Sequence, residues 1–362
     1  MAVIDAIETG HFRVPLASVM TDSMHGAMVA FELITVRVID SDGADGLGCT
    51  FTIGRNGGAI HDILAREIRE LAIGADADLI EALWEKIFWG LHYGGRGGPV
   101  TLAQSAFDIA LWDLKAKRAA LPLYRLLGGF DPRVPCYAGG IDLELSLEDL
   151  LAQTDGNLAR GFRAIKMKVG RPRLSEDVAR VAAMRRHLGD GFALMVDANM
   201  RWTVDESVRA ARALAPHDLT WLEEPIPPDD VDGHARVLRD GGIAIATGEN
   251  LRSIWDFRHL ITHGGVSFPE PDVCNCGGIT SFMKIAHLAE AFGLKVTSHG
   301  AHDITVHLLA AAPNRSFLEV HGFALGKLIA EPLAIVDGLA RAPERPGHGL
   351  RLDWEALDRV RA

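Results

Sequence analysis

Hydrophobic and polar positions follow two different rhythms along the chain. In the first third, residues 29–40 (VAFELITVRVID) alternate and are rich in β-branched side chains, which indicates a strand. A turn cluster at 41–46 and a second strand at 47–53 complete a hairpin. Apolar residues three and four positions apart then predict helices near 59–73, 78–90 and 101–118. The pattern along residues 1–125 therefore predicts an α+β unit.

From residue 134 onward, short apolar runs recur and are mostly separated by helix-like segments. Their starts are 21 to 29 residues apart, and the eight runs are 134–140, 163–169, 192–198, 219–224, 243–248, 266–271, 295–299 and 316–320. Eight alternations of strand and helix predict a (β/α)8 barrel over residues 126–325, and hence an α/β protein. An open doubly wound sheet alternates in the same way. The number of repeats, and the lack of a nucleotide-type glycine turn after the first strand, favour the barrel.

Composition narrows the function classes. The 362 residues are 48% hydrophobic and carry a net charge of −11 with no basic run, which argues against nucleic acid and anionic membranes as partners. No apolar stretch has the length of a membrane helix, and the N-terminus lacks the features of a signal peptide. Four scattered cysteines do not form a disulfide framework. We expect a cytoplasmic enzyme.

Three acidic residues stand at the ends of three consecutive predicted strands. Asp197, Glu223 and Glu249 are spaced 26 residues apart. Strand ends surround the active site of a barrel, so these side chains converge, and their mutual repulsion calls for a cation. A single acid at such a place is more often a loop or capping group, but three together favour a metal site. An all-carboxylate site suits Mg²⁺.

Two lysines share one face of the second predicted strand. In Lys166-Met167-Lys168, the period of two places both ammonium groups on one face and Met167 on the other. Adjacent positive charges lower each other's pKa, which predicts a lysine that can act as a base near neutral pH. An isolated pair could equally extend its charged ends to solvent, but the acidic cluster on the next strand favours catalysis.

A third set of candidate residues ends the last three strands. Asp272 lies near the end of the sixth strand and His299 at the end of the seventh. A carboxylate can accept the Nδ1–H of the ring, which fixes the tautomer and leaves Nε2 facing the mouth. Glu319 ends the eighth strand, and we expect it to be held protonated so that it donates a hydrogen bond to an enolate oxygen. Cys274 and Cys276 lack a second pair of zinc ligands and are expected to be packing residues.

The motifs around these residues resemble a known family. IKMKVG, MVDAN, WLEEP, TGEN, PDVCNCGGIT and TSHG strongly resemble the mandelate racemase subgroup of the enolase superfamily, and the resemblance covers almost the whole chain. It implies a modified TIM barrel with an N-terminal capping domain. It also implies a C-terminal segment, residues 326–362, that packs back on that domain, and a homo-oligomer such as an octamer.

The resemblance further implies one Mg²⁺ per subunit and abstraction of the proton α to a substrate carboxylate, through an enediolate. The metal ligands match Asp197, Glu223 and Glu249. Of the other residues, Lys168 matches the base on one face, Lys166 its partner near the carboxylate, His299 with Asp272 the base or acid on the other face, and Glu319 the enolate hydrogen-bond donor.

Polar segments of the predicted cap indicate the substrate class. Residues 20–26, 52–58 and 93–98 look able to close over the barrel mouth, although ordinary surface turns read the same way. We expect substrate contacts from Arg55, Arg96 and His25 and, on the barrel, from Asn199; these side chains suit a polyhydroxylated acid. Two arginines favour a diacid.

The resulting hypothesis is dehydration of an acid sugar, an aldonate or an aldarate such as galactarate or talarate, to a 2-keto-3-deoxy acid. A racemase or epimerase of a 2-hydroxy acid would use the same groups and is distinguished by forming no ketone. A catalytically silent sugar-acid-binding protein is the alternative from another class. The complete set of site residues argues against it.

Overall fold

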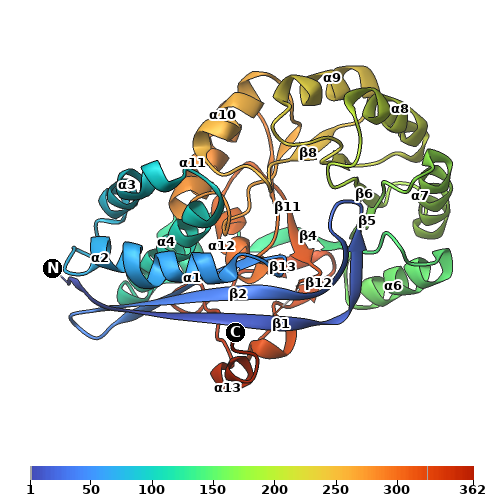
Figure 1. The fold of residues 1–362 in the computed structure, drawn as a ribbon. Coiled ribbons are helices and arrows are strands. Elements are labelled where there is room, and N and C mark those ends of the chain that lie inside the picture. Colours follow the sequence, from blue (N-terminus) through green and yellow to red (C-terminus); the bar gives the residue numbers. More distant parts are fainter. Residues whose placement is uncertain (1, 324) are drawn as a thin grey trace.

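The structure, a computed structural model, describes residues 2–323 and 325–362. An antiparallel sheet with its helices packs against a barrel of parallel strands (Figure 1). The predicted fold class, a modified (β/α)8 barrel with an N-terminal α+β capping domain, is confirmed. Within the described ranges, no helix combines the length and the apolar character needed to cross a membrane.

The cap is a three-stranded sheet in the order β1-β2-β3, with helices packed on one face. The long helix α4 lies so close to β3 that a Cβ at Gly48 would clash with the backbone of Ala106. The elements are β1 (Ile4–Asp22), β2 (Gly26–Asp40), β3 (Asp45–Thr52), α1 (Gly57–Asp62), a π-helical segment (Ile63–Ile68), α2 (Arg69–Ala72), α3 (Ile80–Leu91), a 3-10 turn (His92–Gly94), α4 (Gly98–Arg118) and α5 (Leu123–Leu126).

Strand β1 is the main feature of the cap that the sequence pattern does not predict. Its buried positions do not alternate regularly, because register shifts interrupt its pairing with β2 between Ile4 and Ala6 and between Pro15 and Met20. Pro15 has no N–H group to donate and is tolerated because β1 lies at the edge of the sheet. The predicted hairpin therefore accounts for two strands, β2 and β3, of a three-stranded sheet.

Each of the eight predicted runs overlaps one barrel strand. Neighbours follow the order β10-β11-β4-β5-β6-β7-β8-β9, and a parallel bridge between Asp272 and His299 joins the two ends of that order. The strands are β4 (Arg133–Gly139), β5 (Ala164–Lys168), β6 (Ala193–Asp197), β7 (Leu222–Glu223), β8 (Ile245–Thr247), β9 (Phe268–Pro269), β10 (Val296–Ser298) and β11 (Arg315–His321).

Helices follow the first seven strands and form the outer layer (Figure 1). Local sequence defines their starts: α8, for example, begins with a capping box in which Thr203 and Glu206 satisfy each other's backbone N–H groups. The helices are α6 (Leu147–Ala159), α7 (Leu174–Leu188), α8 (Val204–Leu214) with a 3-10 turn (Ala215–His217), α9 (Val231–Gly241), α10 (Ile254–Thr262), α11 (Gly278–Ala291) and α12 (His302–Ala311). Strand β11 leads instead into the C-terminal segment.

The C-terminal segment runs back to the cap. It comprises a 3-10 turn (Gly326–Leu328), β12 (Ile335–Val336), β13 (Leu339–Arg341) and α13 (Trp354–Asp358). Strand β13 pairs with β4. The backbone N–H of Arg13 donates to the carbonyl of Val360 at 2.8 Å, and that of Ala362 donates to His11 at 2.9 Å. The last residues thus cover part of the open edge of β1.

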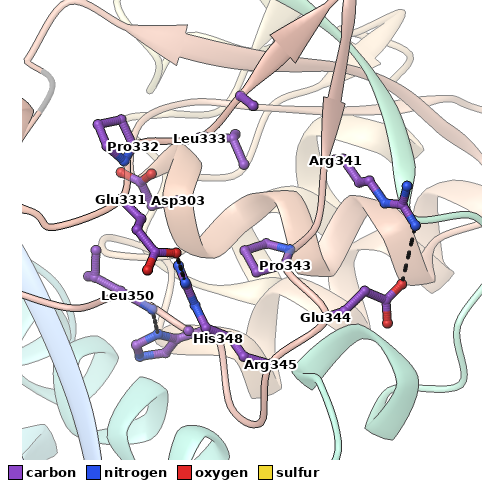
Figure 2. A pocket seen from close by; sticks show the side chains of 12 residues that line it. Asp303, Glu331, Pro332, Leu333, Arg341, Pro343, Glu344, Arg345, His348 and Leu350 are labelled. Carbon is purple, nitrogen blue, oxygen red and sulfur yellow. Dashed lines mark hydrogen bonds and ion pairs between the residues drawn. The ribbon is translucent and has the colours of Figure 1, made fainter.

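The same segment forms a polar pocket of about 320 Å³ (Figure 2). Arg345 pairs there with Glu331, and Arg341 lies 3.8 Å from Glu344. None of the predicted site residues lines this pocket. Asp303 of α12 also lines the pocket, and Glu344 pairs with Arg125 of α5 at 3.0 Å. The pocket is therefore formed by the segment and the elements on which it packs, and it is separate from the candidate site.

Candidate active site

Strand β5 carries both lysines on the inner side of the barrel. Met167 packs outward with Leu194 and Val196 in the apolar layer beneath the helices. Lys166 and Lys168 consequently face inward, and their exposed fractions are 1% and 5%. A buried ammonium group requires a partner, so the neighbouring side chains decide what the lysines do.

Three carboxylates converge beside the lysines. Asp197 ends β6, Glu223 ends β7 and Glu249 follows β8 by two residues, and one oxygen from each lies within 4.8 Å of the other two. Asp197 Oδ1 accepts the backbone N–H of Asn199 at 2.8 Å, and Glu223 Oε2 accepts the indole N–H of Trp221 at 2.9 Å. These hydrogen bonds orient the carboxylates. An all-oxygen set of this spacing fits a hard divalent cation such as Mg²⁺.

Both ammonium groups pair with carboxylates. Lys166 contacts Glu223, and Lys168 contacts Asp197. Burial lowers the pKa of each lysine, but the carboxylates outweigh burial and raise the pKa of both above the usual value. Lys166 does lower the pKa of Lys168, as expected, but each ammonium group is in direct contact with a carboxylate. The expectation of a lysine whose pKa lies near neutral pH is therefore wrong for this arrangement, because the net shift is upward.

His299 and Asp272 form a hydrogen-bonded pair across the mouth from Lys168. His299 Nδ1 lies 2.8 Å from Asp272 Oδ2, whose partner oxygen accepts the backbone N–H of Cys274 at 2.7 Å. The other ring nitrogen, Nε2, lies 3.3 Å from Glu249. Burial lowers the pKa of His299, but the surrounding carboxylates, that of Glu249 foremost, raise it to about 10. The ring is held as a proton donor that faces the carboxylate cluster.

Glu319 lies between the two sets of residues. Its Oε1 is 2.8 Å from Lys166 Nζ, and its Oε2 accepts the backbone N–H of Gly300 at 3.2 Å. Burial raises the pKa of this carboxyl, but the charge of Lys166 lowers it below its ordinary range. The expectation of a protonated acid is therefore wrong here: Glu319 is an ionised partner of Lys166.

The tip of the β1–β2 hairpin bends toward β5 and β6 (Figure 1). Ser23 Oγ donates to the carbonyl of Ala198 at 2.6 Å, which ties the tip to the loop after β6. His25 Nδ1 lies 2.8 Å from Asp22 Oδ2. The hydrogen bond to Asp22 raises the pKa of His25, and the negative charge of Glu249 adds to the effect. The negative charge of Glu249 thus acts on His25, which lies near the barrel rim. We use this term for the strand ends that carry the two lysines, the three clustered carboxylates, His299 and Glu319.

The remaining predicted substrate contacts differ in position. Asn199 is buried, and its Oδ1 has no hydrogen-bond partner among the described residues. Arg55 and Arg96 are exposed, and neither forms a hydrogen bond or ion pair within the described ranges. Arg96 lines a small pocket between the cap and the barrel, with Trp84 of α3 and Arg252 of the loop after β8. The fold therefore brings Asn199 and His25 to the rim and leaves both arginines at the surface.

Sequence reasoning missed several buried polar residues at the strand ends. Glu224 accepts two hydrogen bonds from Asn250, and Glu270 accepts the phenol O–H of Tyr137 at 3.1 Å. His321 ends β11, one residue beyond the predicted end of that strand. The alternation of side chains along a strand could have identified two of them. Glu270 lies two positions from Asp272, and His321 lies two positions from Glu319, so each shares a face with a predicted site residue.

Comparisons with known proteins agree with this geometry. Residues 8–128 match the family model of the mandelate racemase / muconate lactonizing enzyme N-terminal domain, and residues 149–356 match that of the enolase C-terminal domain-like family. The chain is 57% identical over 358 residues to the 3,6-anhydro-alpha-L-galactonate cycloisomerase of Streptomyces coelicolor, which covers 99% of both proteins. It is 36% identical to the L-talarate/galactarate dehydratase of Salmonella typhimurium, over 94% of this chain and 87% of that protein.

Solved structures show the same fold with magnesium. A racemase from Streptomyces coelicolor with bound magnesium has a TM-score of 0.98 at 56% identity, over 99% of this chain and 100% of that one. L-Talarate dehydratase from a Polaromonas species, complexed with Mg and L-glucarate, has a TM-score of 0.94 at 38% identity, over 100% of this chain and 98% of that one.

Proposed function

Because the chain belongs to the mandelate racemase subgroup of the enolase superfamily, we propose that it is a cycloisomerase that opens the ring of a 3,6-anhydro aldonate by elimination. The observation that carries the proposal is the 57% identity, over 99% of both chains, to a protein of that activity. The acid-sugar dehydratase of the sequence hypothesis is the second candidate, favoured by 36% identity to a talarate/galactarate dehydratase.

Both candidates share one chemistry. In a 3,6-anhydro aldonate the ring oxygen is bonded to C3, which is β to the carboxylate. Loss of the C2 proton and cleavage of the C3–O bond give an enol that becomes a 2-keto-3-deoxy acid. The oxygen stays attached through C6, so the product is an isomer of the substrate. In a dehydratase the same bond carries a hydroxyl group, which leaves as water.

The first step is removal of the C2 proton. Lys168 takes the proton on one face, and Lys166 binds a carboxylate oxygen on which the enediolate charge develops. Asp197, Glu223 and Glu249 would hold Mg²⁺, which would polarise the substrate carboxylate and offset the negative charge that raises the pKa of both lysines.

The second step takes place on the opposite face. The electron pair of the C3–O bond goes to the departing oxygen, which receives a proton from His299 Nε2. Asp272 holds the ring in place through Nδ1 at 2.8 Å. Glu319 keeps Lys166 in position from the other side, at 2.8 Å.

The substrate contacts come from the rim and the hairpin tip. The unpartnered Oδ1 of buried Asn199 is an acceptor for a sugar hydroxyl. His25, fixed by Asp22, presents its other ring nitrogen from above. A small polyhydroxylated acid with a single carboxylate matches these two groups and makes no demand on the exposed arginines.

Parallel incubations with Mg²⁺ test the proposal. 3,6-Anhydro-L-galactonate, galactarate and talarate are each followed by ketone formation and by mass spectrometry. We expect the anhydro acid to give a ketone of unchanged mass with the highest kcat/KM. Lys168→Ala is the control for background elimination.

Each other outcome identifies an alternative. A ketone formed only from the aldarates, with loss of one water, replaces the cycloisomerase by a dehydratase. Inversion at C2 without a ketone indicates a racemase or epimerase. No exchange of the α-proton with D₂O for any acid sugar that binds indicates a binding protein.

A further inference from the structure

His321 is a buried histidine at the barrel mouth to which the proposed mechanism gives no role. It ends β11 two residues after Glu319, so both side chains point to the same side of the strand. Its exposed fraction is 8%, and its ring centre lies 4.8 Å from that of His299. Because this polar side chain lies so close to the reacting groups, we ask whether it takes part in the reaction.

The hydrogen bonding of His321 determines where its proton lies. The backbone N–H of Phe323 donates to His321 Nδ1 at 3.0 Å, so Nδ1 is an acceptor and carries no proton. The proton of the neutral ring is therefore on Nε2. Burial lowers the pKa of His321 well below its ordinary value, which keeps the ring neutral. Across residues 2–323 and 325–362, no acceptor pairs with this Nε2–H group.

Aromatic packing fixes the ring as well as its tautomer. Phe323 packs against His321 in an edge-on arrangement with centroids 4.8 Å apart, and Phe31 of β2 stacks on Phe323 at 5.8 Å. The imidazole is thus held between the cap and His299. A donor that is oriented before the substrate binds needs little reorganisation during the reaction.

The groups around His321 indicate which kind of atom accepts the hydrogen bond from its Nε2–H group. Ligand atoms of His299, Glu319 and His321 all lie within 4.8 Å of one another. Three such groups could instead bind a metal ion, but Nε2 of His321 carries a proton for as long as Nδ1 accepts from Phe323. An oxygen atom between the two imidazoles fits the protonation better.

We propose that His321 donates a hydrogen bond from Nε2 to the substrate oxygen that leaves C3, beside His299. The inference rests on the proposed function and extends it to a residue that contacts the leaving group. As the C3–O bond breaks and its electron pair moves to the oxygen, His299 gives up its Nε2 proton and His321 keeps its own. His321 therefore stabilises the developing negative charge without being consumed.

The test separates elimination from proton abstraction. Wild-type protein, His321→Leu and His321→Gln are incubated with Mg²⁺ and 3,6-anhydro-L-galactonate in D₂O, and NMR follows deuterium at C2 alongside ketone formation. Removal of one oriented donor should lower kcat for the ketone about 100-fold. Exchange at C2 should persist, because Lys168 is untouched, so the ratio of exchange to elimination rises. Gln, which offers an N–H group at a similar reach, should restore most of kcat.

His234→Leu is the matched control, since His234 is also a buried histidine and lies on α9, outside the site. It should leave the ratio of exchange to elimination unchanged. A parallel fall of exchange and elimination in both His321 variants, or full elimination in His321→Leu, overturns the proposal. Thermal melts are recorded for each variant, and His321→Met, which also lacks an N–H donor, replaces Leu as the test if Leu does not fold.

Failure of the proposed function looks different. A wild-type protein that forms water and ketone from galactarate, but nothing from the anhydro acid, changes the substrate and leaves His321 to be tested on that elimination. A wild-type protein that forms no ketone from any acid sugar contradicts the proposed function, and with it the role of His321.

Discussion

The side chains at the barrel rim are buried and paired with one another, whereas those of the two glycine-rich loops of the cap are exposed. Lys166 is 1% exposed and lies between two carboxylates. Tyr93, in the loop before α4, is 96% exposed. The hairpin tip is intermediate, since Ser23 is tied to the loop after β6 but His25 remains partly open.

The decrease in burial and pairing from the rim to the exposed loops indicates that different residues carry out the reaction and select the substrate. Rim groups keep their geometry because their ion pairs and hydrogen bonds fix it before any substrate arrives, which suits groups that must act on developing charge. Arg55 and Arg96 in the glycine-rich loops form no hydrogen bond or ion pair with the described residues, so they can vary without disturbing the reaction. We therefore expect effects of substitution to decrease from the rim to the hairpin tip and then to the exposed loops.

The largest effect is expected at the metal ligands. A chelator should abolish turnover, and readdition of Mg²⁺ should restore it. Glu223→Gln should lower kcat at least about 1,000-fold, because it removes one of three charges that hold the cation while leaving the strand intact. Ketone formation and thermal melts measure the two properties. Full activity in excess chelator would contradict the enediolate mechanism.

Substitutions on the two sides of the rim should have different effects on proton exchange and ketone formation. Lys168→Ala should lower both turnover and C2–H exchange by about 100- to 10,000-fold, since it removes the base. His299→Asn should stop ketone formation to a similar extent but still permit exchange at Lys168. NMR of C2 in D₂O reads both rates. For the C2 epimer we expect the two roles to exchange, so both epimers are measured. Exchange that survives in the double variant excludes both residues as bases.

Sequence pattern predicted the rim well because strand ends in a barrel obey simple rules. The positions of Lys166, Asp197 and Glu223 follow from period two and from the convergence of parallel strands. The pattern ended the last strand at residue 320 and so missed His321. It also missed β1, where bulges and Pro15 break the alternation.

The protonation states could not be predicted from the sequence, for a different reason. The pKa values of Lys168 and Glu319 depend on which charges are in contact after folding, and these contacts join residues on different strands. Local sequence suggested lysine repelling lysine, whereas the fold places a carboxylate against each ammonium group. Three-dimensional pairing decided the sign of the shift in both cases.

The hairpin tip should show an intermediate effect. His25→Ala should raise KM about 10-fold and change kcat less, because the ring contacts substrate but not the reacting bonds. Asp22→Asn is the matched change, since it removes the carboxylate that orients the ring at 2.8 Å. Steady-state kinetics on the anhydro acid measure both. A loss confined to kcat would place His25 in the chemistry of the rim instead.

The contact between cap and barrel should respond to pH. Asp108 of α4 is buried against α11, where Thr280 donates to both of its oxygens. Burial, with a smaller contribution from Glu81, raises its pKa from 3.8 to about 7. Between these values the folded protein holds a proton that the unfolded chain has lost, so this residue's contribution to stability falls as pH rises from about 4 to 7.

Asp108→Asn should remove that dependence. Above pH 7 the variant should be more stable than wild type, by on the order of 4 kcal/mol, while near pH 4 the two should converge. Thermal melts across this range give the difference. A difference that stays constant with pH would show that the carboxyl is ionised throughout.

The smallest effects are expected at the exposed arginines, where the proposed substrate and the sequence hypothesis make opposite predictions. A 3,6-anhydro aldonate has one carboxylate, which the rim binds, so Arg55→Ala and Arg96→Ala should change its kcat/KM less than about threefold. A diacid such as galactarate has a second carboxylate, and an arginine that closes over it would form a bidentate pair whose loss costs about 2 to 5 kcal/mol. Neither guanidinium group forms a hydrogen bond or ion pair with the described residues, so each substitution removes no such interaction from the free protein and a selective effect reports on the bound state. Measuring kcat/KM for both acids with each variant therefore compares the cap with the rim directly. A selective loss on galactarate would make the loops part of a diacid site and favour the dehydratase, whereas equal small effects leave recognition to the rim and the hairpin tip.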